Sequence, residues 1–79
     1  MKPQIDHHSR IVSRADVLGG RPCVKGTRMG VRDVLAYLAG GDSVETLLAA
    51  FPYLTREDVQ ACLAFAADQA DHPVVLAAE

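Results

Sequence analysis

The chain has no tryptophan, and it has only two cysteines and three histidines among its 79 residues. Cys23 and Cys62 lie 39 positions apart and form no Cys-x-x-Cys pair, so the sequence offers neither a cysteine-based metal site nor a disulfide framework. The histidines are too scattered for the spacing of metal ligands. We therefore predict a protein without metal or cofactor, in which both cysteines are small buried side chains.

Long apolar runs and catalytic patterns are also missing. No apolar run approaches the ~20 residues of a membrane-spanning helix, and the first eight residues lack the apolar core of a signal peptide. We therefore expect a cytoplasmic protein that does not enter a membrane. There is no Ser-His-Asp or Cys-His neighbourhood, and Gly26-Thr27-Arg28 lacks the spacing of a phosphate-binding loop. We expect no catalytic residue and no enzymatic activity.

The eight basic and ten acidic residues are distributed unevenly along the chain. Residues 1–32 hold seven basic and two acidic residues, whereas residues 33–79 hold Arg56 and eight acidic residues. Such asymmetry is typical of a chain whose basic part meets an anionic partner such as nucleic acid. The two halves can instead neutralise each other, within one fold or across a dimer, and the sequence leaves both interpretations open.

The basic half centres on a glycine-rich stretch, Gly19–Val31, which contains four of the six glycines. A glycine pair before a proline predicts a turn, because glycine reaches positive φ freely and proline fixes φ. Pro22–Val24 then predicts a short strand, which pairs with either Ile11–Ser13 or Val17–Leu18. A second bend follows at Gly26-Thr27-Arg28. The stretch therefore predicts a β-hairpin or arm that leads into the first helix.

This arm carries the strongest candidates for binding an anion. Four cations fall within twelve residues: Arg21, Lys25, Arg28 and Arg32. Arginine forks match phosphate geometry, and basic arms can lie in a DNA groove. We also expect at least one of the four to have a structural role. In that role an arginine caps helix carbonyls or pairs with Asp33 or Asp16. Arg28 is the first candidate, because it lies next to the bend and near Asp33.

Apolar residues at helical spacing predict three helices, at 31–39, 43–51 and 55–70. The first ends at Gly40-Gly41 and the second before Pro52, because glycine favours helix ends and the residue before proline leaves the α region. The predicted core faces are Val31, Val34, Leu35, Leu38, Val44, Leu47, Leu48, Phe51, Val59, Cys62, Leu63 and Ala66.

Two of these helices begin at residues that commonly cap helices. Asp42 or Ser43 caps the second helix. Thr55 caps the third, with Asp58 three residues later, which is the spacing of a capping box. Acidic residues in the first turns thus have a structural explanation.

The second and third helices, joined by a three-residue turn, have the dimensions of a helix-turn-helix motif. In such motifs the N-terminal side chains of the second helix read DNA bases, which here would be Thr55, Arg56 and Gln60. The neighbouring Glu57 and Asp58 weaken this interpretation, because they repel phosphates. Compact helix pairs with short turns also occur in proteins that bind no DNA.

We therefore predict a mainly α fold: a three-helix, helix-turn-helix-like bundle, homeodomain-like or winged, preceded by a short N-terminal β-hairpin or arm. The expected organisation is a flexible N-terminus at 1–9, a single domain at 10–70 and a C-terminal tail at 71–79. A domain this small is marginal alone, which favours a homodimer.

Three segments together resemble one known family. They are GRPCVKGTR at 20–28, LAGGDSVE at 38–45 and FPYLTREDV at 51–59. In this order they are similar to the family labelled "domain of unknown function 433", over roughly residues 10–68. Gly30 stands where that family often has proline.

The resemblance implies an antitoxin of a bacterial type II toxin–antitoxin pair. Such a protein binds and neutralises a PIN-like ribonuclease toxin, and it represses its own operon by binding operator DNA. The competing hypothesis is a protein–protein interaction module, a homodimeric scaffold that binds no DNA. The basic arm favours the first hypothesis, and the acidic third helix favours the second.

Overall fold

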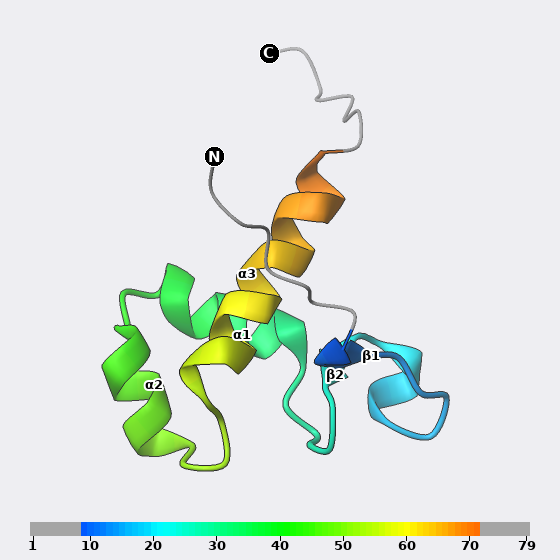
Figure 1. The fold of residues 1–79 in the computed structure, drawn as a ribbon, viewed down its shortest axis with the longest axis horizontal. Coiled ribbons are helices and arrows are strands. Elements are labelled where there is room, and N and C mark those ends of the chain that lie inside the picture. Colours follow the sequence, from blue (N-terminus) through cyan, green and yellow to red (C-terminus); the bar gives the residue numbers. More distant parts are fainter. Residues whose placement is uncertain (1–8, 72–79) are drawn as a thin grey trace.

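The computed structural model of the protein describes residues 9–71, which form two short strands and three α-helices (Figure 1). The elements are β1 (Ile11–Val12), the 3-10 turn η2 (Leu18–Gly20), β2 (Cys23–Val24), α1 (Val31–Ala39), α2 (Val44–Ala50) and α3 (Arg56–Ala70). The predicted fold class, three helices preceded by a β-hairpin, is confirmed. The flexible N-terminus and the C-terminal tail of the prediction lie outside the described residues, apart from Ser9 and Asp71.

β1 and β2 form an antiparallel pair, with Ile11 opposite Val24 and Val12 opposite Cys23. The structure thereby selects Ile11–Val12, and not Val17–Leu18, as the partner of the second strand. Ile11, Cys23 and Val24 are buried. A two-stranded ribbon is marginal in water by itself, so its packing against the helices is what stabilises it.

The bend between β2 and α1 is fixed by the Thr27 side chain. Its hydroxyl donates to the carbonyl of Val24 over 2.9 Å and accepts from the N–H of Met29 over 2.9 Å. Gly26 has φ 80°, a left-handed conformation that glycine adopts at little cost. The Val24 N–H also donates to the Met29 carbonyl over 2.9 Å. These bonds close a tight turn over residues 25–28.

α1 begins where this turn meets the strands. The N–H of Val31 donates to the carbonyl of Pro22 over 3.0 Å, which ties the helix start to the arm. The helix ends at Ala39 with Gly40 as its C-cap, and Gly41 follows with φ 105°. The predicted bounds of this helix are confirmed.

α2 is capped by Ser43, whose side chain accepts from the N–H of Thr46 over 3.0 Å. This contact decides between Ser43 and Asp42, the two caps that the sequence allowed. The helix stops before Pro52, as expected from the restriction that proline places on its predecessor. The observed helix is one residue shorter at each end than the prediction.

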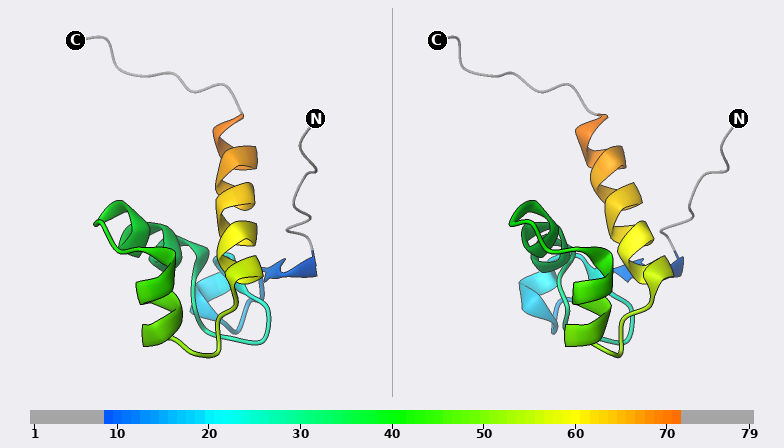
Figure 2. Two further views of the ribbon diagram at one scale, coloured as in Figure 1. Left: turned by 60° about the vertical axis from the view of Figure 1, so that its left-hand side comes forward. Right: turned by 90° about the vertical axis from the view of Figure 1, so that its left-hand side faces the viewer.

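α3 begins with the predicted capping box. Thr55 accepts from the N–H of Asp58 over 3.1 Å, and the Asp58 carboxylate accepts from the N–H of Thr55 over 3.0 Å. Two of the four unpaired donors at the helix start are thereby satisfied. The second half of α3 projects beyond the rest of the described chain (Figure 2).

The core lies where α1, α2 and α3 meet the strand pair. Its buried apolar members are Ile11, Val24, Met29, Val31, Val34, Leu47, Leu54, Val59, Ala61 and Cys62. The prediction that Leu63 faces the core is wrong, because its side chain is 46% exposed. Ala61 is the fully buried residue in its place. Leu63 and Ala61 both lie in an alanine-rich helix, and the sequence does not show which of the two is buried.

Candidate functional site

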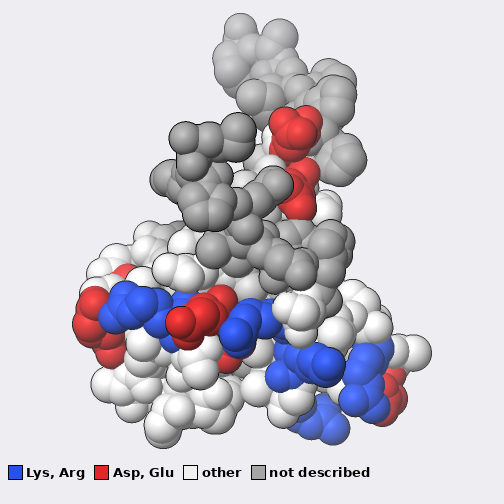
Figure 3. All heavy atoms as spheres, in the orientation of Figure 1, with Lys and Arg blue, Asp and Glu red and all other residues white. Residues whose placement is uncertain are grey.

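The four predicted arm cations are exposed, and none of them forms an ion pair with another described residue. The ion pairs among residues 9–71 instead use Arg10 with Asp58, Arg14 with Asp16, and Arg56 with Glu45. Basic side chains form a band across one face of the body (Figure 3). The acidic half of the chain therefore does not neutralise the arm within the described fold.

The structural role predicted for Arg28 is not observed. Neither Asp33 nor Asp16 pairs with its guanidinium, and Asp16 pairs with Arg14 over 3.3 Å. Within the described residues the wider expectation, that at least one arm cation is structural, is also wrong. Thr27 holds the turn through its own side chain, so the bend needs no arginine to close it.

The structure separates the arm cations into two pairs. Lys25 and Arg28 lie on the turn at residues 25–28, which Thr27 fixes. Arg21 and Arg32 line a groove between the start of α1 and the second half of α3. The four cations fall within twelve residues of the sequence, and the path of the chain places them in two different parts of the surface.

The predicted contacts on α3 are partly occupied. The Thr55 hydroxyl serves as the helix cap. Arg56 donates to Glu45 over 2.9 Å, and this hydrogen bond lowers the pKa of the Glu45 carboxyl. Gln60 is exposed. Because two of the three side chains already have partners within the fold, the N-terminal end of α3 is a weaker candidate for binding an anion than the arm is.

One ion pair joins the arm to α3, and the sequence did not reveal it. Arg10 donates to the Asp58 carboxylate over 3.0 Å, and the Asp58 side chain is only 12% exposed. The same carboxylate completes the capping box with Thr55. Next to it, the N–H of Lys25 donates to the Arg10 carbonyl over 2.7 Å. Asp58 therefore orients both the start of α3 and the strand beside the Lys25 turn.

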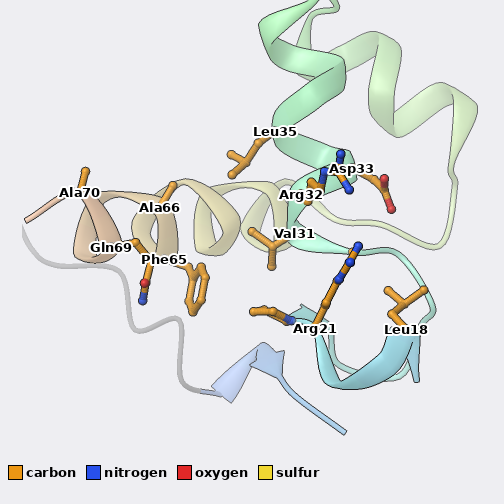
Figure 4. A pocket seen from close by; sticks show the side chains of 12 residues that line it. Leu18, Arg21, Val31, Arg32, Asp33, Leu35, Phe65, Ala66, Gln69 and Ala70 are labelled. Carbon is orange, nitrogen blue, oxygen red and sulfur yellow. The ribbon is translucent and has the colours of Figure 1, made fainter. Parts of the chain in front are cut away.

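The groove has a volume of about 660 Å³ and a mainly apolar lining (Figure 4). Phe65, Val31 and Leu35 lie in its middle, Ala70 marks one end, and Leu18 and Arg21 mark the other. The groove and its lining were not predicted. Helix periodicity identifies which residues face inward, but it does not show where two packed elements leave a depression.

Leu18 is an unusual residue in this lining. Its φ is 52°, in the left-handed region that bulky L-residues avoid. Its side chain is 37% exposed, and its Cδ1 atom lies 3.3 Å from the position that a Cβ on Gly30 would occupy. Backbone strain of this kind persists where surrounding structure enforces it, and it concentrates at functional sites.

A second apolar surface lies at the far end of α1. Tyr37 and Phe51 have ring centroids 5.4 Å apart, and Tyr53 lies 6.1 Å from Phe51. Tyr37 and Tyr53 are 41% and 55% exposed. Tyrosine is enriched among residues that dominate protein interfaces. This aromatic row is a candidate contact for a protein partner.

The cysteines have the environment that the sequence predicted. Both are buried and free. Burial raises the pKa of the Cys62 thiol to about 11, and the nearby Asp58 carboxylate adds to the rise. The thiol is therefore protonated at neutral pH, and since the thiolate is the reactive form, Cys62 is a poor nucleophile.

Among residues 9–71, no three His, Cys, Asp or Glu residues are grouped so that they could hold a metal ion. The three histidines lie outside this range. None of the helices in the described part is long and apolar enough to cross a membrane.

Comparison with known proteins identifies the family. The family described as "protein of unknown function (DUF433)" matches residues 11–66, which include β1, β2, α1, α2 and most of α3. The chain belongs to the DUF433 family. The GTR turn and the capped start of α3, which carried the resemblance in the sequence, both lie within the matched region.

Two relatives show how far the similarity to known proteins extends. The crystal structure of a DUF433 member from Anabaena variabilis ATCC 29413 has a TM-score of 0.76 and 30% identity, covering 81% of this chain and 63% of that one. Uncharacterized protein y4eO of Sinorhizobium fredii is 48% identical over 50 residues, which are 63% of this chain and 23% of that protein. The chain thus spans about a quarter of its curated relative's length. The fold is shared, and the activity of the longer protein is a separate question.

Proposed function

We propose that this DUF433 protein is the antitoxin of a toxin–antitoxin pair, which neutralises a PIN-like ribonuclease and binds operator DNA as an autorepressor. The family resemblance supports the pairing with a ribonuclease. The observation that carries the DNA-binding part is the turn at 25–28, because Lys25 and Arg28 are exposed there on a fixed backbone and have no ion-pair partner in residues 9–71.

Phosphate binding requires cations that are not already neutralised and that are held in place. Lys25 and Arg28 meet both conditions, and α3 packs against β1 of the same arm, whereas α2 lies on the other side of α3 from the strands (Figure 1). Charge-assisted contacts to phosphate give most of the affinity in non-specific DNA binding. We assign DNA contact first to this turn, with Arg21 and Arg32 as secondary contacts, and only then to Thr55, Arg56 and Gln60.

Neutralisation of the nuclease is assigned to the helical, acidic part of the chain. Asp42 and Glu57 are exposed there, and neither forms an ion pair with a described residue. The aromatic row of Tyr37, Phe51 and Tyr53 provides apolar contact area, and the Asp42 N–H donates to the Tyr37 carbonyl over 3.1 Å, which places this acid next to the row. A surface of this composition suits a nuclease whose RNA-binding cleft is basic, since potentials at an interface tend to be complementary.

The neutralisation is tested by co-expression with a neighbouring PIN-like nuclease gene. We expect the nuclease alone to arrest growth, and we expect co-expression of the full chain to restore growth and to co-purify the nuclease. The control is a catalytically inactive nuclease, which should co-purify without any effect on growth. Arrest that persists in the presence of well-expressed chain contradicts the antitoxin assignment.

DNA binding is tested separately in a gel shift with the DNA upstream of the gene. The double variant Lys25→Glu/Arg28→Glu should weaken retention at least tenfold at moderate salt, because attractive phosphate contacts become repulsive. The control is Arg14→Glu, compared with the single variant Lys25→Glu: both make the same change in net charge, but Arg14 lies outside the turn, so its variant should bind within about threefold of the wild type. Equal loss in both variants, or loss in the control alone, would overturn the assignment to the turn.

The alternative function, a protein–protein module without DNA contact, is favoured by the two exposed apolar surfaces. Rescue of growth without any retention of upstream DNA would select this alternative. The two experiments therefore separate neutralisation from repression.

A further inference from the structure

Arg10 is a basic residue at the start of the arm, and the proposed function gives it no ligand. It directly precedes β1, and its carbonyl accepts from the N–H of Lys25 over 2.7 Å. Its guanidinium donates to the Asp58 carboxylate over 3.0 Å, while the side chain stays 42% exposed. Arg10 therefore lies beside the turn at 25–28, and its contact with α3 holds it there.

The pairing of β1 with β2 places Arg10 opposite Lys25. Ile11 lies opposite Val24 in this antiparallel pair, and the bond from the Lys25 N–H to the Arg10 carbonyl continues the register by one residue. Directly opposite residues of an antiparallel pair have their side chains on the same face. Arg10 and Lys25 are therefore neighbours on one face, at the end of the strand pair.

Lys25 has a second cationic neighbour on its other side. The Val24 N–H donates to the Met29 carbonyl over 2.9 Å, so the chain after the bend runs back along β2. The next two positions towards the bend are Lys25 and Arg28. Arg10, Lys25 and Arg28 thus form one row across three neighbouring segments of the chain, which we call the cation row.

The length of the cation row suits a polymer of phosphates. Paired segments lie about 4.8 Å apart, so the row extends over about 10 Å. Each strand of duplex DNA carries one phosphate for about every 3.4 Å of helix axis, so a row of this length faces more than one phosphate. The strand pair and the turn at 25–28 also lie on the face that carries the basic band (Figure 3).

The ion pair with Asp58 leaves Arg10 able to bind an anion. A guanidinium has five N–H donors, and within residues 9–71 one bond to a carboxylate is formed. The Asp58 carboxylate also accepts from the Thr55 N–H, and its side chain is 12% exposed against 42% for Arg10. A phosphate that approaches from the solvent therefore meets the cation and not the carboxylate. Arginine donors on such a fixed fork match the oxygens of a phosphate.

We propose that the cation row is the binding site for the phosphodiester backbone of duplex DNA, and that Arg10 is a direct phosphate contact in it. This inference rests on the proposed DNA binding and deepens it, because it adds Arg10 and defines the ligand as the backbone. Contacts to phosphates fix the position of a protein on DNA and carry no sequence information. The row therefore binds every duplex alike, and preference for an operator depends on other residues.

The test is the salt dependence of binding, measured by fluorescence anisotropy with the full chain and two duplexes, a random sequence and the DNA upstream of the gene. Arg10→Gln should reduce the slope of log K against log salt by about 0.9, the value for one lost phosphate contact. It should weaken binding to both duplexes alike, by about fivefold or more at low salt. The matched control is Arg14→Gln, which removes the same charge from a side chain that is 62% exposed and should keep the wild-type slope.

Asp58→Asn separates phosphate contact from support of the fold. It breaks the same ion pair as Arg10→Gln but keeps the cation, so its slope should equal that of the wild type. Circular dichroism checks that each variant is folded at the temperature of the binding measurement. If Arg10 only supports the fold, Asp58→Asn and Arg10→Gln should change binding and slope equally, and that result would overturn the proposal.

The remaining outcomes distinguish this inference from the proposed function. A wild type that binds DNA, with an unchanged slope in Arg10→Gln, overturns the role of Arg10 and leaves the assignment of DNA contact to the turn at 25–28 standing. The expected slopes, obtained without any preference for the upstream DNA, support the cation row and contradict the autorepressor. A wild type that binds neither duplex overturns both.

Discussion

Replacement of Asp58 by alanine is expected to lower the free energy of unfolding by about 3 kcal/mol. The carboxylate has two partners: it accepts from the Thr55 N–H over 3.0 Å and from Arg10 over 3.0 Å. Alanine leaves the Thr55 donor unsatisfied and the Arg10 guanidinium without its carboxylate. Urea denaturation measures the change, and for a domain of this size the melting temperature should fall by roughly 12 °C or more.

The controls for this prediction separate the cap from the ion pair. Asp58→Asn keeps an oxygen that can accept from Thr55 but loses the charge that faces Arg10, so it should cost less than alanine does. Glu45→Ala removes the exposed partner of Arg56, whose side chain is itself 50% exposed, and should leave the unfolding midpoint unchanged within error, as is usual for surface pairs. If Glu45→Ala lowers the free energy of unfolding as much as Asp58→Ala does, the burial of Asp58 does not explain the stability that its contacts provide.

The same residue explains why the arm and the helices belong to one unit. Asp58 completes the capping box of α3 and contacts Arg10, whose carbonyl accepts from the Lys25 N–H at the start of the turn. Loss of the carboxylate should therefore affect both the stability of the bundle and the position of the basic turn. The capping role follows from spacing within four residues. The Arg10 contact joins residues 48 positions apart, and no local pattern encodes it.

Local signals predicted most of the fold. The bounds of α1, the capping box of α3 and the bend at Gly26 depend on residues within a few positions of each other. These are governed by backbone conformation and hydrogen bonding over one or two turns. The cap of α2 could not be predicted, because Asp42 and Ser43 are both good caps, and the structure shows that it is Ser43.

The candidate site was less predictable than the fold. The sequence identified the four arm cations. It did not show that two of them lie on a turn and two in a groove, because the groove depends on how α1 packs against α3. The expectation that Arg28 would pair with Asp33 relied on distance in sequence alone. Nothing in the sequence predicted the left-handed φ of Leu18. A leucine before two glycines is common, and only its backbone conformation in the structure is unusual.

Replacement of Leu47 by alanine is expected to lower the free energy of unfolding by about 3 kcal/mol. The side chain is 1% exposed and belongs to the core that α1, α2 and α3 share. Its removal takes apolar area out of the core and leaves a cavity that close-packed neighbours fill only in part. A domain this small has little stability in reserve, so chemical denaturation should show a large shift in midpoint with an unchanged slope.

Leu63→Ala is the matched control, because it makes the same chemical change on a residue that is 46% exposed. The cost should stay within about 0.5 kcal/mol, as for surface substitutions generally, and alanine has the higher helix propensity. The comparison tests the correction that the structure makes to the helix pattern of α3. Helical spacing placed Leu63 in the core, whereas the structure places Ala61 there. If Leu63→Ala destabilises the chain as much as Leu47→Ala does, α3 is rotated relative to this description, and Phe65 and Ala66 no longer face the groove together.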